Sequence, residues 1–144
     1  MVQAVGGFEH PRYLLDKISA TVYISDGPWE VEYTDQFEGW WDSLTAGERR
    51  PVIAAIDLLA EDGPNLGRPA VDTLTASRHP NMKELRAGTI RVLFAFDPRR
   101  CAILLIGGDK RGRWQEFYDR MIPIADDLYD EHLVEIANEE PNAP

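Results

Sequence analysis

The chain has 144 residues, 44% of them hydrophobic, which is enough for one domain with a single core. A formal charge of −10 argues at face value against a nucleic-acid partner, and the single cysteine, Cys101, excludes an intrachain disulfide and a cysteine-based zinc cluster. No stretch approaches the ~18 apolar residues of a membrane span and no secretory signal is recognisable, so we expect a cytoplasmic protein without a membrane partner.

Residues 1–28 show no clear periodicity and are interrupted by glycine and proline. We treat them as an N-terminal extension of uncertain order, with at most one short helix or strand near Tyr13–Ile24. The domain proper is expected to begin at Trp29 and to cover residues 29–140.

Residues 29–34 alternate apolar and polar side chains, which predicts a strand with one buried face. Thr34 or Asp35 can then cap a short helix. The apolar residues of this helix recur at helical spacing and are Phe37, Trp40, Trp41 and Leu44.

A second helix should begin at Thr45, because Thr45 and Glu48 have the spacing of a capping box. Pro51 is tolerated near its start, and Gly63-Pro64 should end it. Two short helices joined this tightly predict an antiparallel helical hairpin.

Residues 65–80 are expected to form a loop, because Gly67, Pro69 and Pro80 interrupt them. Three strand segments follow, at residues 82–86, 89–96 and 101–106, and short turns between them predict an antiparallel meander. Gly107-Gly108 is expected to break the last strand. Cys101 lies at the start of its apolar run and is interpreted as a buried packing residue.

The chain from Trp114 onward should be helical, and Pro123 is expected to kink or divide this helix. The predicted buried stripe consists of Phe117, Met121, Ile124, Leu128, His132 and Ile136. The order β-α-α-β-β-β-α predicts an α+β domain: a small, mostly antiparallel sheet with an N-terminal helical hairpin and a C-terminal helix, all packed on one face.

Charge is distributed unevenly along the chain. Residues 30–42 hold five acidic residues and residues 126–144 hold seven, with no lysine or arginine in either segment. Residues 63–113 instead hold ten basic residues against four acidic ones. Because a protein binds phosphates with a local patch rather than with its average charge, this middle segment can still hold a nucleic-acid site. The acidic ends weaken long-range steering toward RNA.

Five short motifs occur in an order and spacing that resemble one known family. They are residues 66–69 (LGRP), 77–86 (SRHPNMKELR), 90–94 (IRVLF), 101–110 (CAILLIGGDK) and 117–118 (FY). Together they resemble the RelE/ParE superfamily, and the first two resemble its phage-related HigB branch. The resemblance covers about residues 29–136.

The resemblance implies a RelE-like fold and the toxin of a type II toxin–antitoxin pair. Such a toxin docks on the ribosome and acts as an mRNA endoribonuclease without a metal or other cofactor. The ribose 2′-hydroxyl attacks the adjacent phosphate in line, arginine and lysine stabilise the charge, and a side chain such as tyrosine moves protons. The resemblance also implies a helix-turn-helix antitoxin as partner, in a complex that binds its own promoter DNA.

The catalytic candidates that the resemblance implies are Arg86, Arg91, Arg111 and Tyr118. Because side chains alternate along a strand, Leu85 should face the core, with Arg86 and Glu84 on the opposite, open face. Arg91 stands where the family places a phosphate-binding arginine, and a guanidinium can hold two phosphate oxygens at once. Arg111 matches the family's arginine near the scissile phosphate, with one residue more before the aromatic. Tyr118 could act as a base only if nearby cations lower its pKa from ~10.

The candidates for contacting RNA are Arg78, His79, Lys83, Lys110 and Arg113. Several relatives carry two lysines at alternate positions of the first strand in the meander, where this chain has Met82 and Glu84. Lys83 would therefore face away from the site unless a bulge intervenes. His10 and His132 have no companion ligands, so no metal site is expected.

Every candidate also has a structural interpretation. The two strand arginines could be solvated residues paired with Glu84, the basic loop could simply be exposed, and Tyr118 could pack beside Phe117. Two other classes remain open: a ParE-like toxin that inhibits gyrase by binding alone, and a degenerate, non-toxic protein-binding member. For a cleaving toxin we expect Arg91→Ala and Arg111→Ala to abolish toxicity with the melting temperature nearly unchanged.

Overall fold

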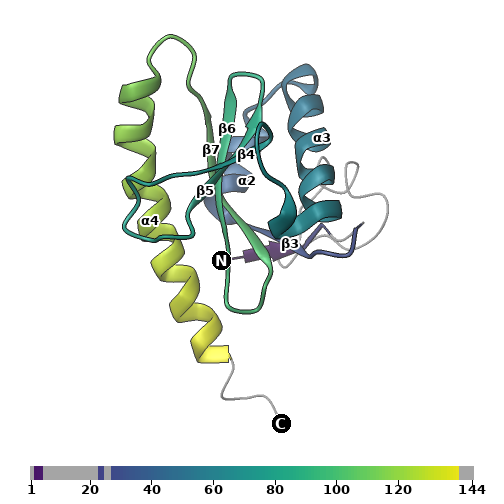
Figure 1. Ribbon diagram of the computed structural model, residues 1–144, viewed down its shortest axis with the longest axis vertical. Helices are drawn as coiled ribbons and strands as arrows, with labels where there is room; N and C mark the ends of the chain where they lie inside the picture. The colour runs from purple at the N-terminus through teal and green to yellow at the C-terminus, as the bar shows by residue number, and fades with distance from the viewer. Residues whose placement is uncertain (1, 5–22, 25–26, 140–144) are drawn as a thin grey trace.

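The computed structural model describes residues 2–4, 23–24 and 27–139 (Figure 1). In chain order the elements are β1 (Val2–Ala4), β2 (Tyr23–Ile24), β3 (Val31–Thr34), α2 (Asp35–Asp42), α3 (Ala46–Asp62), the 3-10 helix η1 (Gly63–Asn65), β4 (Val71–Thr73), β5 (Lys83–Ala87), β6 (Ile90–Phe96), β7 (Ala102–Asp109) and α4 (Trp114–Glu139). From β3 onward this is the predicted order, with β4 added inside the segment expected to be a loop.

The strands form one mixed sheet in the order β1-β3-β7-β6-β5-β4, and β2 also pairs with β3. The predicted meander of β5, β6 and β7 is confirmed as antiparallel, while β3 runs parallel to β7. Gly88 adopts a φ of 65° in the tight turn between β5 and β6, a conformation that favours glycine. Of the segment Tyr13–Ile24, only the two residues of β2 lie within the described part of the chain.

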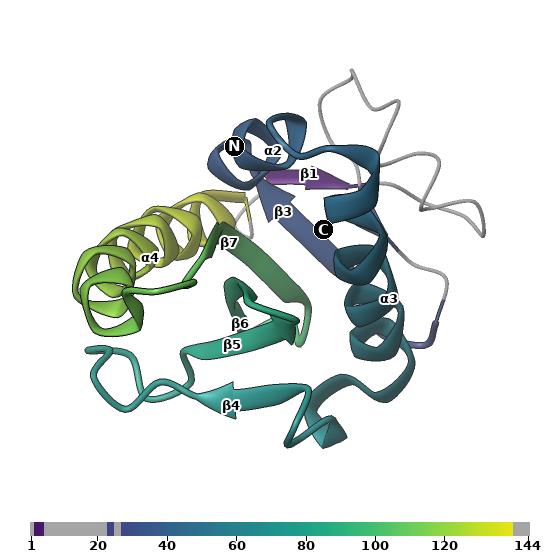
Figure 2. The same ribbon diagram turned by 90° about the horizontal axis from the view of Figure 1, so that it is seen from above.

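Helices cover both faces of the sheet, so the expectation that all helices pack on one face is wrong. One buried cluster joins α2 and α3 to one face, and a second joins α4 to the other (Figure 2). The cause is visible in β6, where every residue from Ile90 to Ala95 is buried. A strand with apolar residues at consecutive positions needs cover on both sides.

The predicted caps fix the two helices of the first face. Thr34 Oγ1 accepts a hydrogen bond from Phe37 N at 3.0 Å at the start of α2. At the start of α3, Glu48 N donates to Thr45 Oγ1 at 3.1 Å and Thr45 N donates to Glu48 Oε1 at 2.8 Å, which confirms the capping box. The helix α2 contacts β3 and β7, and α3 contacts β5.

The glycine pair after Ile106 does not break β7, which runs on to Asp109. A Cβ on Gly107 would lie 2.4 Å from the Trp40 ring of α2, and one on Gly108 would lie 2.7 Å from the Phe117 ring of α4. The two glycines therefore let one helix approach each face of the strand closely.

The helix α4 is continuous through Pro123, so the expected division is wrong. Pro123 lies on the exposed side of the helix, where water can satisfy the carbonyl that proline leaves unpaired. Burial confirms the predicted stripe except at Ile124, which is 37% exposed. Among the described residues, no helix combines the length and the apolar character that crossing a membrane requires.

Candidate active site

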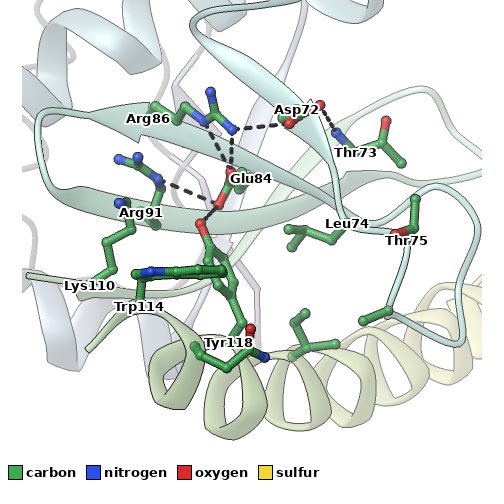
Figure 3. A pocket seen from close by; sticks show the side chains of 13 residues that line it. Asp72, Thr73, Leu74, Thr75, Glu84, Arg86, Arg91, Lys110, Trp114 and Tyr118 are labelled. Atoms are coloured by element: carbon green, nitrogen blue, oxygen red, sulfur yellow. Dashed lines mark hydrogen bonds and ion pairs between the residues drawn. The ribbon is translucent and has the colours of Figure 1, made fainter. Parts of the chain in front are cut away.

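A cavity of about 480 Å³, referred to below as the cleft, lies between β4, β5 and β6 and the start of α4 (Figure 3). Its charged lining residues are Asp72, Glu84, Arg86, Arg91 and Lys110, and its aromatic ones are Trp114 and Tyr118. Strand alternation explains the convergence on the sheet side. Leu85 and Val92 point into the core under α3, so Glu84, Arg86 and Arg91 face α4.

Glu84 lies at the centre of these contacts and is 2% exposed. Its Oε2 accepts from Arg86 Nε and lies 3.0 Å from Arg86 Nη2, and its Oε1 lies 3.6 Å from Arg91 Nε and accepts from Tyr118 Oη at 2.5 Å. The predicted facing of Glu84 was correct, but α4 covers this face, so the expectation of an open face is wrong.

Arg86 is the more accessible of the two strand arginines, with 32% of its side chain exposed. Its Nη2 also donates to Asp72 Oδ2 at 3.0 Å, which ties β5 to β4. The hydrogen bond from Arg68 and the charge of Arg86 lower the pKa of Asp72. Arg86 therefore faces the cleft between two carboxylates of this chain.

Arg91 is 8% exposed and is held by the turn it follows. Its Nη1 donates to the carbonyl oxygens of Gly88 and Ile90, at 2.6 and 3.0 Å. Removing this side chain would remove both hydrogen bonds, which together contribute roughly 1–3 kcal/mol. From the structure we therefore expect Arg91→Ala to lower the melting temperature, where the sequence alone led us to expect almost no change.

The pKa of Tyr118 moves in the direction opposite to the one a base would need. Burial raises the pKa of its hydroxyl, and the hydrogen bond to Glu84 raises it further, while Arg91 acts in the other direction. The condition under which Tyr118 could act as a base on its own, a pKa lowered by nearby cations, is therefore not met. Tyr118 is a neutral phenol in the cleft.

Lys110 and Trp114 form the outer part of the cleft. Among the described residues, Lys110 has no ion-pair partner, and its backbone is anchored by a hydrogen bond from Lys110 N to Thr89 O at 3.0 Å. Trp114 is 59% exposed, and its ring centroid lies 6.3 Å from that of Tyr118. The cleft thus presents a lysine and an indole face to solvent.

The two predicted arginines of the loop between β7 and α4 lie outside the cleft lining. Arg111 has 77% of its side chain exposed and pairs with Asp109, and Arg113 has 80% exposed and pairs with Glu116. Arg111, which the resemblance implied to be catalytic, therefore does not line the cleft.

Arg78 and His79 connect the segment before β5 to α4. Arg78 pairs with Asp126, Asp127 and Asp130, and His79 Nε2 lies 2.8 Å from Asp130 Oδ1. Hydrogen bonds to Asp130 and Asp127 raise the pKa of Arg78. Arg78 lines a neighbouring cavity of about 340 Å³ that shares Tyr118 with the cleft, whereas His79 lines neither cavity.

Lys83 faces away from the cleft, as the alternation predicted, and its Nζ donates to Thr73 Oγ1 at 3.2 Å. The surplus of basic residues between residues 63 and 113 does not form a surface of unpaired cations. Within the described residues, carboxylates of this chain pair with most of the arginines between residues 63 and 113.

One cluster of metal-ligating side chains occurs in the described part of the chain, formed by Glu30, Glu32 and Cys101. Arg99 already pairs with Glu32 at 2.7 Å, and burial raises the pKa of the Cys101 thiol, which favours the protonated form. This donor set does not suit a metal ion, and it lies outside the cleft. The predicted burial of Cys101 is confirmed.

Among the charged and aromatic residues that line the cleft, sequence reasoning missed two, Asp72 and Trp114. Asp72 belongs to β4, a three-residue strand between prolines that gives almost no periodic signal. Trp114 had one available signal, since a tryptophan in a basic loop before an amphipathic helix has no place in the apolar stripe that Phe117 and Met121 begin.

Comparison with known proteins finds one matching family and two similar proteins. The family described as "Phage derived protein Gp49-like" matches residues 39–130. Two relatives from Mycobacterium tuberculosis carry toxin names: HigB2 is 42% identical over 129 residues, which are 86% of this chain and 64% of HigB2, and HigB3 is 58% identical over 93 residues, which are 63% of this chain and 82% of HigB3. The chain thus spans less than two thirds of the length of HigB2.

Two solved structures are also similar. The RelB–RelE antitoxin–toxin complex from Methanococcus jannaschii matches 59% of this chain and 96% of the matched chain, with a TM-score of 0.47 and 9% identity. The RelE–RelB complex from Pyrococcus horikoshii matches 59% and 97%, with a TM-score of 0.47 and 20% identity. On the family match, this chain belongs to the Gp49-like family, and its identity to HigB3 makes it a relative of the HigB proteins.

Proposed function

We propose that this protein is the toxin of a type II toxin–antitoxin pair and that it inhibits translation by cutting mRNA on the ribosome. Its family supports the first part, because HigB2 and HigB3 carry toxin names. The convergence of Arg86, Arg91, Lys110 and Tyr118 on one cleft supports the second part. This convergence is the observation on which the nuclease proposal rests.

The charges of the cleft suit a phosphodiester. Three cations, Arg86, Arg91 and Lys110, face two carboxylates, Asp72 and Glu84, which leaves one net positive charge. Lys110 can approach a phosphate directly. Arg86 can do so by exchanging Asp72 for a phosphate oxygen, since that pair is exposed enough for water to compete with it.

The aromatic side of the cleft suits an unpaired base. An exposed indole beside a cationic pocket provides a stacking surface for single-stranded RNA, whose bases can be turned outward. Trp114 and Tyr118 stand one helical turn apart at the start of α4, on the same side as the phosphate-binding cations. A nucleotide could therefore stack its base on Trp114 while its phosphate contacts Arg86 and Lys110.

The partners follow from the same proposal. The toxin would act on mRNA in the ribosomal A site, and a helix-turn-helix antitoxin would hold it inactive in a complex that binds its own promoter DNA. The reaction would need no metal, because the 2′-hydroxyl of RNA is the nucleophile and the cations of the cleft supply the charge stabilisation.

Induced expression in a bacterial host, alone and together with the neighbouring antitoxin gene, tests this proposal. We expect growth arrest, cuts in translated mRNA that keep codon phase when RNA 5′ ends are mapped, and the loss of both effects when the antitoxin is present. Arrest with DNA breaks and intact mRNA would replace the nuclease by a gyrase inhibitor. A folded, soluble chain that neither arrests growth nor cuts mRNA would contradict the toxin proposal altogether.

A further inference from the structure

Glu84 is a buried carboxylate at the point where a substrate would meet Tyr118. Its Oε1 accepts a hydrogen bond from the Tyr118 hydroxyl at 2.5 Å, while Arg86 on β5 and Arg91 on β6 form ion pairs with the carboxylate (Figure 3). A carboxylate here needs its own explanation, because burying a charge is costly unless it is paired.

The hydrogen bond from Tyr118 has a chemical consequence. A neutral phenol with a raised pKa is a poor source of phenolate, so Tyr118 alone cannot serve as the base. Its hydroxyl, however, already donates to Glu84, and with Arg91 also acting on this hydroxyl, one lone pair of Oη remains to accept another hydrogen bond from the side of the cleft.

We propose that Glu84 is the proton acceptor of the cleavage reaction and that it acts through Tyr118. This inference rests on the proposed nuclease function and adds Glu84 to the catalytic candidates that the resemblance implied, which were Arg86, Arg91, Arg111 and Tyr118.

The proposed step balances in atoms and charge. The ribose 2′-oxygen forms a bond to the adjacent phosphorus, and the bond from that phosphorus to the 5′-oxygen breaks, which yields a 2′,3′-cyclic phosphate. The 2′-hydroxyl proton passes to Tyr118 Oη as the Tyr118 proton passes to Glu84. The departing 5′-oxygen takes a proton from solvent, and Glu84 later returns its proton to solvent.

The charges around Glu84 suit this transfer. The groups that face it are Arg86 on β5, Arg91 on β6, Tyr118 on α4 and, beyond Arg86, Asp72 on β4. When Glu84 becomes neutral, its ion pair with Arg86 weakens as negative charge develops on the phosphorane. Arg86 can then turn its donors toward the phosphate, so stabilisation increases in the transition state.

Single-turnover cleavage of ribosome-bound mRNA tests the proposal, with purified wild type, Glu84→Gln, Tyr118→Phe and the double variant. We expect each single change to slow cleavage by about 10²–10⁴-fold and the double variant to be no slower than the slower single one. The affinity for programmed ribosomes should stay near the wild-type value. Glu84→Asp should recover part of the rate that Glu84→Gln loses.

Asp97→Asn provides the matched control, because Asp97 is another buried carboxylate that contacts α4, outside the cleft. This variant should cleave at the wild-type rate at temperatures where it is folded. A folded Glu84→Gln that cuts as fast as the wild type, or faster, would overturn the inference and leave the nuclease in place. If Glu84→Gln fails to fold, a fully active Tyr118→Phe would overturn it equally, whereas an inactive wild type would contradict the nuclease itself.

Discussion

The two ends of α4 are attached to the sheet by the same chemistry in two different settings. Near its start, Tyr118 donates to Glu84, which pairs with Arg86; near its end, His132 lies 2.7 Å from Asp97, which pairs with Arg99. The first cluster opens onto the cleft. The second does not line the cleft, and both His132 and Asp97 have side chains at most 1% exposed.

The comparison separates a structural ion-pair network from a candidate functional one. Asp97 accepts from the backbone nitrogens of Arg99 and Cys101 as well as from Arg99 and His132, so its oxygens are fully occupied within the chain. Each network also holds one buried nitrogen without a hydrogen-bond partner, Arg91 Nε in the first and His132 Nδ1 in the second. Only the first of these lies on a residue that lines the cleft, so only the first network can offer its spare donor to a ligand there, whereas the second serves the turn between β6 and β7.

The largest expected effect comes from exchanging the two arginines for alanine. Arg86 and Arg99 each pair with two carboxylates and have 32% and 35% of their side chains exposed. Both changes should destabilise the fold by on the order of 1–3 kcal/mol, because each leaves a buried carboxylate with fewer partners. Arg86→Ala should in addition slow mRNA cleavage by about 10²–10³-fold, the usual loss of one transition-state donor.

Cleavage rates and denaturant unfolding of the two variants, side by side, check this prediction. Equal loss of cleavage in Arg86→Ala and Arg99→Ala would mean that stability alone sets the activity. The distinction between the two ends of α4 would then fail.

A smaller effect is expected at Trp114, the exposed ring at the start of α4. Trp114→Ala should weaken binding of a short single-stranded RNA by about 1–3 kcal/mol, the usual value for stacking on one base. Trp114→Phe should keep part of this affinity, and the melting temperature should stay close to wild type because the ring is exposed. Fluorescence titration measures the affinity; an unchanged Trp114→Ala would remove the stacking role.

The smallest effects are opposite pH dependences of stability at the two ends. Burial alone would raise the pKa of Asp97, but hydrogen bonds from His132 and Arg99 lower it below its usual 3.8. Its contribution is therefore complete above about pH 4 and is lost as the pH falls further. Because the pKa of Tyr118 is raised above 10.0, its contribution is complete below pH 10 and is lost as the pH rises.

Unfolding at a series of pH values checks this with Asp97→Asn and Tyr118→Phe. The free-energy difference between wild type and Asp97→Asn should shrink on the acid side, and the difference for Tyr118→Phe should shrink on the alkaline side. If both differences shrink on the same side, one of the two hydrogen-bond networks has been assigned incorrectly.

Local signals predicted most of the fold. Thr34 and Thr45 mark the helix starts because a cap is a contact between residues only a few positions apart. The alternation of Leu85 with Glu84 and Arg86 gave the correct facing. The side of the sheet that α4 covers could not be read in this way, although the unbroken apolar runs of β6 and β7 were a signal of cover on both faces.

The site was harder to predict from the sequence, because it is formed by contacts between residues far apart in the chain. Tyr118 meets Glu84 across 34 residues, and Arg78 meets Asp130 across 52. A count of basic residues along the sequence does not show which of them form ion pairs. In the structure, acidic residues of α4 are the partners of Arg78.

The position of the cleft depends on the absence of side chains at the two glycines of β7, Gly107 and Gly108. A methyl group on Gly108 would press against Phe117, the residue before Tyr118, and so shift the phenol relative to the sheet. One on Gly107 would press on Trp40 from the opposite side. A mutational scan should therefore find these two positions among the least tolerant of any side chain, although neither touches the cleft.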